Sequence, residues 1–415
     1  MKTADSQNIC WCWYQFSFGA LNLALATPAI YLAIGLPLIM RQHGWSGTEI
    51  GVFQLMGFPA LFKIIMAWPV ENRHDIAVTK HYVRWATLLG SAYLLVLLAL
   101  AMSGIDANRW QLFTLGLLAS GLSAWADIPV NALAIYLLPP EERIRAGGIR
   151  SAALCLAAIL GGGLMLLAQQ NWGWHAPFIF MASLLFAALW LLSTLRKTGK
   201  TAKTEHLALV PETAWLATWR DFFRQPGAWR WTLLLLGYFP FVATGWVYLK
   251  PLLLDYGFAA KEVAWIAGVG GGGCAALASL ATARLVNHGT LGRAVPLCAF
   301  AGFATLVFLA AAIWHHADHR VMIVTSLLLA ASMGTTASLA FSLMMEFARV
   351  RHQAVDYGLQ ASLFTLGRLT MPPIAGFILD RFNYVGMLAA LALGALIMAM
   401  FSYIAPLILD WHKTE

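Results

Sequence analysis

The stretch PLIMRQHGWSGTEI, residues 37–50, returns in altered form as PLLLDYGFAAKEV, residues 251–263. In each, a Pro-Leu pair closes an apolar run, a glycine and an aromatic residue follow, and a glutamate stands five residues after the glycine. The glycines and the glutamates are each 213 residues apart. A shorter match, GIR at 148–150 and GLQ at 358–360, recurs at an offset of 210 residues. The sequence therefore predicts two similar halves, and chance likeness of apolar helices is the alternative.

Each half is predicted to cross a membrane six times, because a transmembrane helix needs about 20 apolar residues. Runs of this kind lie at 12–39, 48–70, 82–103, 110–137, 149–169, 175–195, 231–253, 262–283, 293–314, 321–345, 355–378 and 384–409. Six crossings return the chain to the starting side, so the halves are expected to be parallel repeats. We expect an N-terminal six-helix bundle at 1–195, a linker at 196–229 and a C-terminal six-helix bundle at 230–415.

The composition supports an all-α integral membrane protein with 12 transmembrane helices. Of the 415 residues, 60% are hydrophobic and 11% are charged, whereas about a quarter of the residues of a soluble domain are charged. The net charge of +8 is explained by basic loops and does not indicate that the protein binds nucleic acid. The five cysteines lack metal-site spacing, and no Walker sequence, nucleophile elbow or H-E-x-x-H motif is present. We therefore expect no metal, no cofactor, no ATPase subunit and no enzymatic activity.

The distribution of basic residues predicts the orientation. With the N-terminus placed inside, 19 of the 27 Lys and Arg residues lie at cytoplasmic ends, six lie at outer ends, and Lys63 and Arg368 lie within spans. Because cytoplasmic loops carry an excess of basic residues, both termini are expected in the cytoplasm. The first apolar run continues to about Met40, too long for a cleaved signal peptide, so we expect it to be the first membrane helix.

Ionisable residues inside spans are the strongest candidates for function, because a charge at mid-bilayer costs about 2.5–3.5 kcal/mol. Asp127 is one of these, and Asn131 follows on the same helix face. Asp127 is either a proton carrier or the partner of Lys63 or Arg150 in a structural ion pair. Arg368 lies too deep to reach water easily, so we expect it to contact a solute or a carboxylate.

Other residues are weaker candidates. Trp125, Tyr238, Trp246 and Gln360 are expected to contact the solute with Lys63, Asp127, Asn131 and Arg368. Arg150, Glu346, Arg349 and Asp356 are helix-end charges. Glu346 and Arg349 form a gate ion pair or solvated caps, Asp356 caps its helix, and Arg150 anchors the topology. The glycine runs 161–163 and 270–273 predict close helix contacts.

Several motifs resemble a known family. The run GFPALFK at 57–63, followed by Trp68-Pro69, resembles the second helix of the muropeptide-permease-like branch of the major facilitator superfamily. Glu71-Asn72-Arg73 stands where that branch has an Asp-Arg pair. Residues 123–142, which include Asp127, resemble the fourth helix of the same branch, where a second acid often occupies the position of Asn131. The resemblance implies two six-helix bundles that rock around a central site by alternating access.

The stretch DYGLQAS at 356–362 is similar to the Asp-Tyr-x-x-Gln-x-Ser pattern of single-component siderophore permeases, the rhizobactin and pyochelin importers. This resemblance implies proton-driven import of a ferric siderophore across the bacterial inner membrane by a monomer. The siderophores of this group are phenolates or hydroxy-carboxylates. The alternatives are a muropeptide, acyl-CoA or drug transporter, or an exporter. A sensor or an enzyme with a transporter fold is the remaining class.

Overall fold

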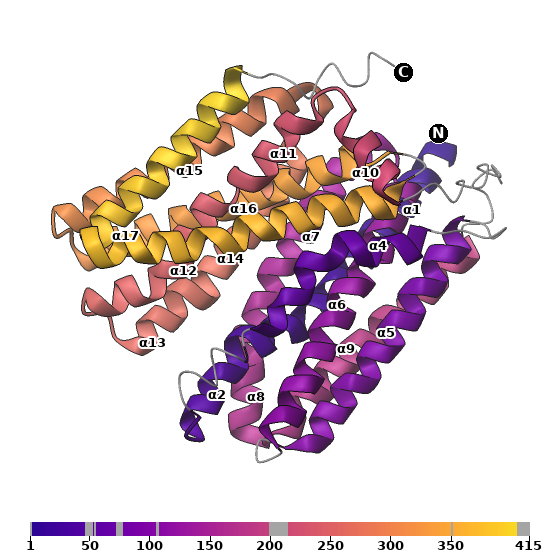
Figure 1. Ribbon diagram of the computed structural model, residues 1–415, viewed down its shortest axis with the longest axis horizontal. Helices are drawn as coiled ribbons and strands as arrows, with labels where there is room; N and C mark the ends of the chain where they lie inside the picture. Colours follow the sequence, from indigo (N-terminus) through magenta and orange to yellow (C-terminus); the bar gives the residue numbers. More distant parts are fainter. Residues whose placement is uncertain are drawn as a thin grey trace. The chain divides into compact units, whose positions relative to one another are not determined.

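The computed structural model (Figure 1) describes residues 2–45, 53, 55–71, 78–104, 108–198, 215–349 and 352–404. All regular elements within these ranges are helical. They are α1 (Lys2–Ile30), η1 (Tyr31–Gly35), α2 (Leu36–Gln42), η2 (Leu55–Phe62), α4 (Lys63–Glu71), α5 (Val78–Ser103), α6 (Arg109–Leu137), α7 (Pro140–Ile159), η3 (Leu160–Leu164), α8 (Met165–Trp172), α9 (His175–Thr198), α10 (Trp215–Phe223), α11 (Ala228–Gly237), α12 (Pro240–Asp255), α13 (Ala260–Val263), η5 (Ala264–Gly270), α14 (Gly271–Leu285), α15 (His288–Trp314), α16 (His319–Glu346) and α17 (Gln353–Ile404).

The helices account for the predicted number of spans. In the described ranges, ten helices are long and apolar enough to cross a membrane. One of them, the 52-residue α17, is interrupted by the non-helical residues Phe382 and Asn383 and therefore supplies two spans. The described part of the predicted second span is formed by η2 and α4, residues 55–71. In the described ranges each predicted span is thus represented by helix, as expected for a multi-pass membrane protein.

Contacts between residues divide the chain into two compact units. Unit 1 contains Met1–Ala146, Leu156–Trp215 and Phe347–Ser362. Unit 2 contains Gly147–Cys155, Leu216–Glu346 and Leu363–Glu415. In unit 1, α5 packs along both α6 and α9, as Figure 1 shows. In unit 2, α16 packs along α14 and α15. The first ten residues of α17 therefore pack with the N-terminal helices, which the sequence pattern did not predict.

The repeat detected in the sequence has a structural counterpart. Gly44 and Gly257 have φ angles of +79° and +83°, a conformation that favours glycine. The N–H of the following residue, Trp45 or Phe258, donates to the carbonyl oxygen five residues earlier at 3.0 or 3.1 Å. Each helix therefore ends in the same glycine-terminated motif, with the following aromatic side chain buried. The predicted Glu49 of the first copy lies outside the described residues.

The glycine runs contain close contacts, as predicted, but only at some positions. A Cβ on Gly161 would lie 2.6 Å from the carbonyl oxygen of Thr27 on α1. A Cβ on Gly271 would lie 2.0 Å from the ring of Trp246. The last glycine of the first run, Gly163, has nothing within 4 Å of its added Cβ. The close approach is therefore confined to one face of the helix.

Candidate functional site

Asp127 is the centre of a polar network in unit 1. It lies within α6, which begins at a hydrogen-bonded cap, where the Asn108 side chain accepts from the N–H of Trp110, and continues past Pro129 to Leu137. Its side chain is 14% exposed. A carboxylate so far from both helix ends needs partners within the protein, because lipid supplies none.

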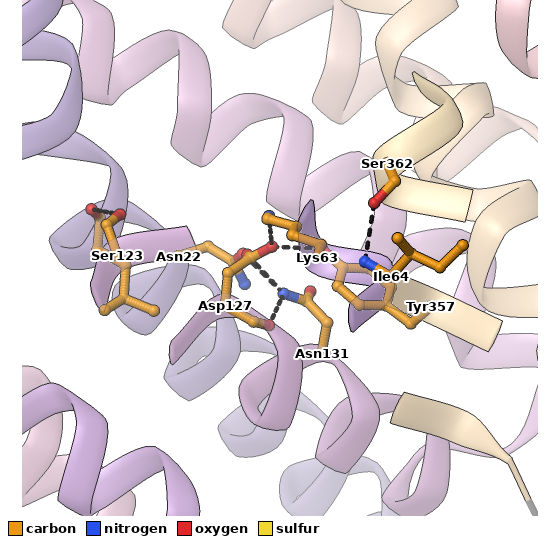
Figure 2. A network of polar contacts seen from close by, with 9 residues as sticks. Asn22, Lys63, Ile64, Ser123, Asp127, Asn131, Tyr357 and Ser362 are labelled. Atoms are coloured by element: carbon orange, nitrogen blue, oxygen red, sulfur yellow. Dashed lines mark hydrogen bonds and ion pairs between the residues drawn. The ribbon is translucent and has the colours of Figure 1, made fainter. Parts of the chain in front are cut away.

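Three side chains donate to the Asp127 carboxylate. Lys63, the first residue of α4, forms an ion pair with Oδ2 through Nζ. The Tyr357 hydroxyl, from the start of α17, donates to the same Oδ2 at 2.7 Å. Asn131 donates from Nδ2 to Oδ1 at 2.8 Å. Figure 2 shows these side chains meeting at the carboxylate. We call this group of Lys63, Asp127, Asn131 and Tyr357 the Asp127 centre.

Backbone contacts hold the elements of the Asp127 centre together. The N–H of Ile64, next to Lys63, donates to the Ser362 hydroxyl at 2.9 Å. A Cβ on Gly358 would lie 2.7 Å from the carbonyl oxygen of Lys63, so a larger residue would separate α17 from α4. On the other side, Asn131 reaches Asn22 of α1 at 3.4 Å. Polar contacts that involve α1, α4, α6 and α17 therefore fix the position of the Asp127 carboxylate.

The remaining residues of the DYGLQAS stretch are engaged within unit 1. Asp356 is fully buried and accepts from Arg349 at three atoms: the backbone N at 2.9 Å, Nε at 2.8 Å and Nη2 at 2.6 Å. Gln360 is also fully buried and donates to the carbonyl oxygen of Asp356 at 3.1 Å. The Asp356 carboxylate is thus held in an ion pair with Arg349 near the start of α17.

The other predicted charges near helix ends lie in unit 2. Arg150 is buried, with its guanidinium carbon 4.4 Å from the centre of the Phe341 ring. Glu346 is 8% exposed and lies 3.7 Å from His288 Nε2, so it is not a solvated cap. Lys63, one of the two proposed partners, forms an ion pair with Asp127 in unit 1.

Arg368 occupies the packed face of α17 in unit 2, yet its side chain is exposed. Phe364 and Ala375, which share its face at helical spacing, are 8% and 1% exposed. On the opposite face, Leu366 and Phe377 are 43% and 57% exposed. Arg368 is therefore an exposed residue on the side of the helix that faces the protein.

Among the residues that the structure describes, Arg368 forms no hydrogen bond or ion pair. The described acids of unit 2 all lie at or near helix ends: Asp221, Asp255, Glu262, Asp318, Glu346 and Asp380. Arg368 itself is 15 residues from the first residue of α17. Within the described part of unit 2, no carboxylate stands at the depth of this guanidinium.

The predicted aromatic candidates are divided between the two units. Trp125 lies in unit 1 with its ring centre 6.1 Å from that of Trp85. Tyr238 is buried at the break between α11 and α12 and donates to the carbonyl oxygen of Val295 at 3.0 Å. The ring of Trp246 packs directly against Gly271. The side chains of Tyr238 and Trp246 thus take part in helix packing within unit 2.

Two residues that bear on the site were missed. The sequence indicates Tyr357 only as part of a family motif, whereas its hydroxyl donates to Asp127 in the structure. It indicates Glu71 only as an altered acid of a motif, whereas Glu71 Oε2 accepts from the backbone of α17. The rest of its motif, Asn72-Arg73, lies outside the described residues. Tyr357 lies at the start of the predicted span 355–378, and Glu71 directly follows the predicted span 48–70. A position at a helix end does not identify the residue that the side chain contacts.

The sequence and the fold match known proteins. The family model of the Major Facilitator Superfamily matches residues 16–369. The Anhydromuropeptide permease of Escherichia coli strain K12 is 26% identical over 372 residues, covering 85% of this chain and 73% of that protein. The protein of the same name from E. coli O157:H7 matches to the same extent.

Solved structures share the fold at low identity. A bacterial homologue of the iron transporter ferroportin, in the outward-facing state, has a TM-score of 0.69 at 15% identity, covering 97% of this chain and 99% of that chain. The human organic anion transporter MFSD10 (TETRAN) has a TM-score of 0.69 at 14% identity, with 94% and 98% covered. The transporter FucP, in the outward conformation, has a TM-score of 0.66 at 17% identity, with 95% and 98% covered.

These matches agree with the helical architecture described above. The family match covers most of the chain, and the solved structures cover nearly all of it. The predicted fold class is confirmed, and the chain belongs to the major facilitator superfamily of membrane transporters.

Proposed function

We propose that this chain is a secondary transporter of the bacterial inner membrane that imports an anionic solute together with protons by alternating access. The proposal includes cytoplasmic termini, a monomer, and two six-helix halves at 1–195 and 230–415 joined by a linker. It rests on the family, on the basic residues of the loops and on the chemistry of two in-span sites.

The single observation that carries the proposal is the Asp127 centre. A mid-span carboxylate is costly, and buried acids of this kind mark proton relays in transporters. Its partners are an ammonium, a phenol and an amide, which can each adjust their hydrogen bonds when the carboxylate gains a proton. Asp127 is therefore our candidate for the group that accepts the coupling proton.

Arg368 supports an anionic solute. A guanidinium presents paired donors that match the two oxygens of a carboxylate. In the described part of unit 2 no acid lies at its depth, and its side chain is exposed on the packed face of α17. A solute that brings its own negative charge would lower the cost of keeping this arginine within the membrane.

The solute we propose first is a ferric siderophore. The support is the DYGLQAS stretch at 356–362, which resembles that of siderophore permeases and supplies Tyr357 to the Asp127 centre. A muropeptide is the second candidate, favoured by the 26% identity to the Anhydromuropeptide permease. Both kinds of compound carry acidic groups that Arg368 would recognise.

An uptake assay tests the proposal. Cells that lack their own inner-membrane importers are supplied with radioactive ferric rhizobactin, ferric pyochelin or labelled anhydromuropeptide, with and without this protein and a protonophore. We expect one compound to accumulate, and the protonophore to abolish its accumulation. If the protein is present in the membrane and none of the three accumulates, import of these solutes is ruled out. Accumulation that survives the protonophore would exclude proton coupling.

A further inference from the structure

A short helix comes directly before the seventh predicted span. α10 is followed by a turn at residues 224–227 and then by α11, which opens the membrane span Ala228–Asp255 (Figure 1). The nine residues of α10 make a helix of about 13 Å, which is too short to cross a membrane. Because the turn between the two helices is short, α10 has to lie at the membrane boundary where this span begins.

The two sides of α10 differ in burial and in charge. Thr218 and Phe222 are four residues apart and both buried, so they face the protein. Arg220 and Arg224 are also four residues apart, and Arg224 continues the helical turn because its N–H donates to the carbonyl oxygen of Arg220 at 3.1 Å. Two residues turn a helix by about 200°, so the arginines lie opposite the buried pair. Both arginine side chains are exposed.

The turn after α10 brings together two aromatic rings. Phe223 of α10 stacks on Trp229 of α11, with ring centres 4.9 Å apart and ring planes at 26°. Gly227 allows this turn with a φ angle of +79°. Trp229 remains 65% exposed, although it lies in the first turn of a membrane span. Tryptophan is enriched at this depth because its ring contacts lipid while its N–H meets polar groups. The exposed ring therefore indicates a surface that meets lipid.

The charge of this surface is mainly positive. Residues 215–230 contain three arginines, Arg220, Arg224 and Arg230, and one acid, Asp221. Asp221 Oδ1 lies 3.9 Å from Arg220 Nε and 3.7 Å from Arg224 Nη1, and these three side chains are all more than half exposed. Exposed ion pairs of this kind contribute little. Arg230 is exposed and forms no ion pair with any residue that the structure describes. The described part of the chain thus leaves three guanidinium groups able to bind an external anion.

We propose that Arg220, Arg224, Trp229 and Arg230 form a surface that binds anionic phospholipid headgroups in the leaflet where α11 begins. We call these four residues the α10 lipid surface. A guanidinium matches phosphate oxygens with paired donors, and the Trp229 ring lies against the lipid below the phosphates. The α10 lipid surface is separate from the in-span residues discussed above, so this inference does not rest on the proposed function.

A lipid fits the α10 lipid surface better than a soluble anion does. A soluble phosphate compound would meet exposed side chains that do not enclose it. A membrane presents many phosphates at one height, so each arginine can contact a different headgroup while Trp229 contacts the chains beneath. Each basic residue close to an anionic bilayer strengthens binding by about fivefold. Together the arginines would hold the end of the linker against the membrane surface.

Native mass spectrometry of the full-length protein in detergent tests this inference. Phosphatidylglycerol or phosphatidylcholine is added, and the dissociation constants of the bound lipids are compared. We expect the wild-type protein to bind phosphatidylglycerol more tightly. Replacing Arg220, Arg224 and Arg230 together by Gln should weaken that binding by at least about fivefold, the effect of one arginine, and by up to about a hundredfold if all three contribute. Glycerol 3-phosphate, which carries the phosphate without acyl chains, should not displace the lipid.

Three further variants separate a local effect from a general loss of charge. Replacing the same three arginines by Lys keeps the charge and should retain most of the preference for phosphatidylglycerol. The matched control replaces by Gln three exposed basic residues at other predicted cytoplasmic ends, Lys80, Arg284 and Arg293, and should bind as the wild type does. Asp221→Asn removes the acid between two arginines and should tighten binding by up to about fivefold.

Several outcomes would overturn the inference. One is equal binding of the two lipids by the wild-type protein, and another is an equal loss in the Gln variant and in the matched control. A loss in the Lys variant as large as in the Gln variant would show that the positive charge is not what binds. Displacement by glycerol 3-phosphate would indicate a site for soluble anions instead of a lipid surface. If the Gln variant does not fold, Asp221→Asn decides, because unchanged or weaker binding in that variant contradicts the assigned role of the arginines.

Discussion

Oε2 of Glu71 accepts hydrogen bonds from the backbone N–H groups of Ala354 at 2.7 Å and Val355 at 3.1 Å. A carboxylate at the end of α4 thus caps the start of α17, 283 residues further along the chain. The first N–H groups of a helix have no partner within it, and a negative charge at that end is favoured by the helix dipole. This cap fixes the start of α17, and with it Tyr357, against α4.

Replacing Glu71 by Gln should therefore destabilise the protein. The amide keeps an acceptor oxygen but loses the charge, and we expect a loss of about 1 kcal/mol in the free energy of unfolding. Thermal unfolding of the purified protein measures it. Glu262→Gln is the matched control, because Glu262 accepts from the N–H of Ala259 at an exposed site. A larger loss in the control than in Glu71→Gln would contradict the assigned role.

Asp127→Asn should abolish accumulation of the solute against its gradient while leaving exchange of the solute across the membrane intact. The amide cannot carry the coupling proton, so uphill uptake should fall to the background of cells without the protein. Exchange of labelled for unlabelled solute across the membrane needs no proton gradient and should persist. Counterflow in vesicles loaded with the solute identified by the uptake assay measures this. Protonophore-sensitive accumulation at the wild-type level in Asp127→Asn would exclude Asp127 as the coupling group.

Arg368→Gln should weaken solute binding. Loss of a charged hydrogen bond costs about 1.5–3 kcal/mol, so kcat/KM for uptake should fall by about ten- to a hundredfold, mainly through KM. Arg368→Lys keeps the charge but lacks the planar guanidinium, so its kcat/KM should lie between those of the wild type and Arg368→Gln. Arg284→Gln, at an exposed position in the last turn of α14, is the control for lost positive charge. An unchanged KM in Arg368→Gln would remove the support for an anionic solute.

Two alanine substitutions in one glycine run should differ in stability. Gly161→Ala places a Cβ 2.6 Å from the Thr27 carbonyl oxygen, so α1 has to move, at a cost of about 1–3 kcal/mol. Gly163→Ala meets nothing within 4 Å and should leave the unfolding temperature unchanged. Both proteins are compared by thermal unfolding in the same detergent. Equal unfolding temperatures would show that the close contact of α1 is not needed for stability.

The sequence predicted the features that depend on local pattern. The spans follow from runs of apolar residues, and Asn131 could be placed beside Asp127 because four residues make about one helical turn. It also offered Lys63 as one of two partners for Asp127. The ion pair with Lys63 depends on the packing of α4 against α6, which no single-sequence pattern encodes.

The features that the sequence did not predict depend on distant contacts. Tyr357 reaches an acid 230 residues earlier in the chain, and Glu71 caps a helix in the other half of the sequence. The aromatic residues were ambiguous for a different reason. Tyr238 and Trp246 would give the same apolar pattern facing lipid, a solute or another helix, and only the contact with Val295 or Gly271 distinguishes these cases.

The matched helix ends at Gly44 and Gly257 bear on how such a chain arises. If one six-helix segment was duplicated, most of its apolar side chains could later be exchanged for others of similar size at little cost. A backbone angle that only glycine adopts cheaply allows no such exchange. After such a duplication, the turn-forming glycines would stay identical in the two halves for longer than the membrane-facing residues around them. Their spacing is a practical marker for locating ancient duplications in transporters whose halves have lost visible similarity.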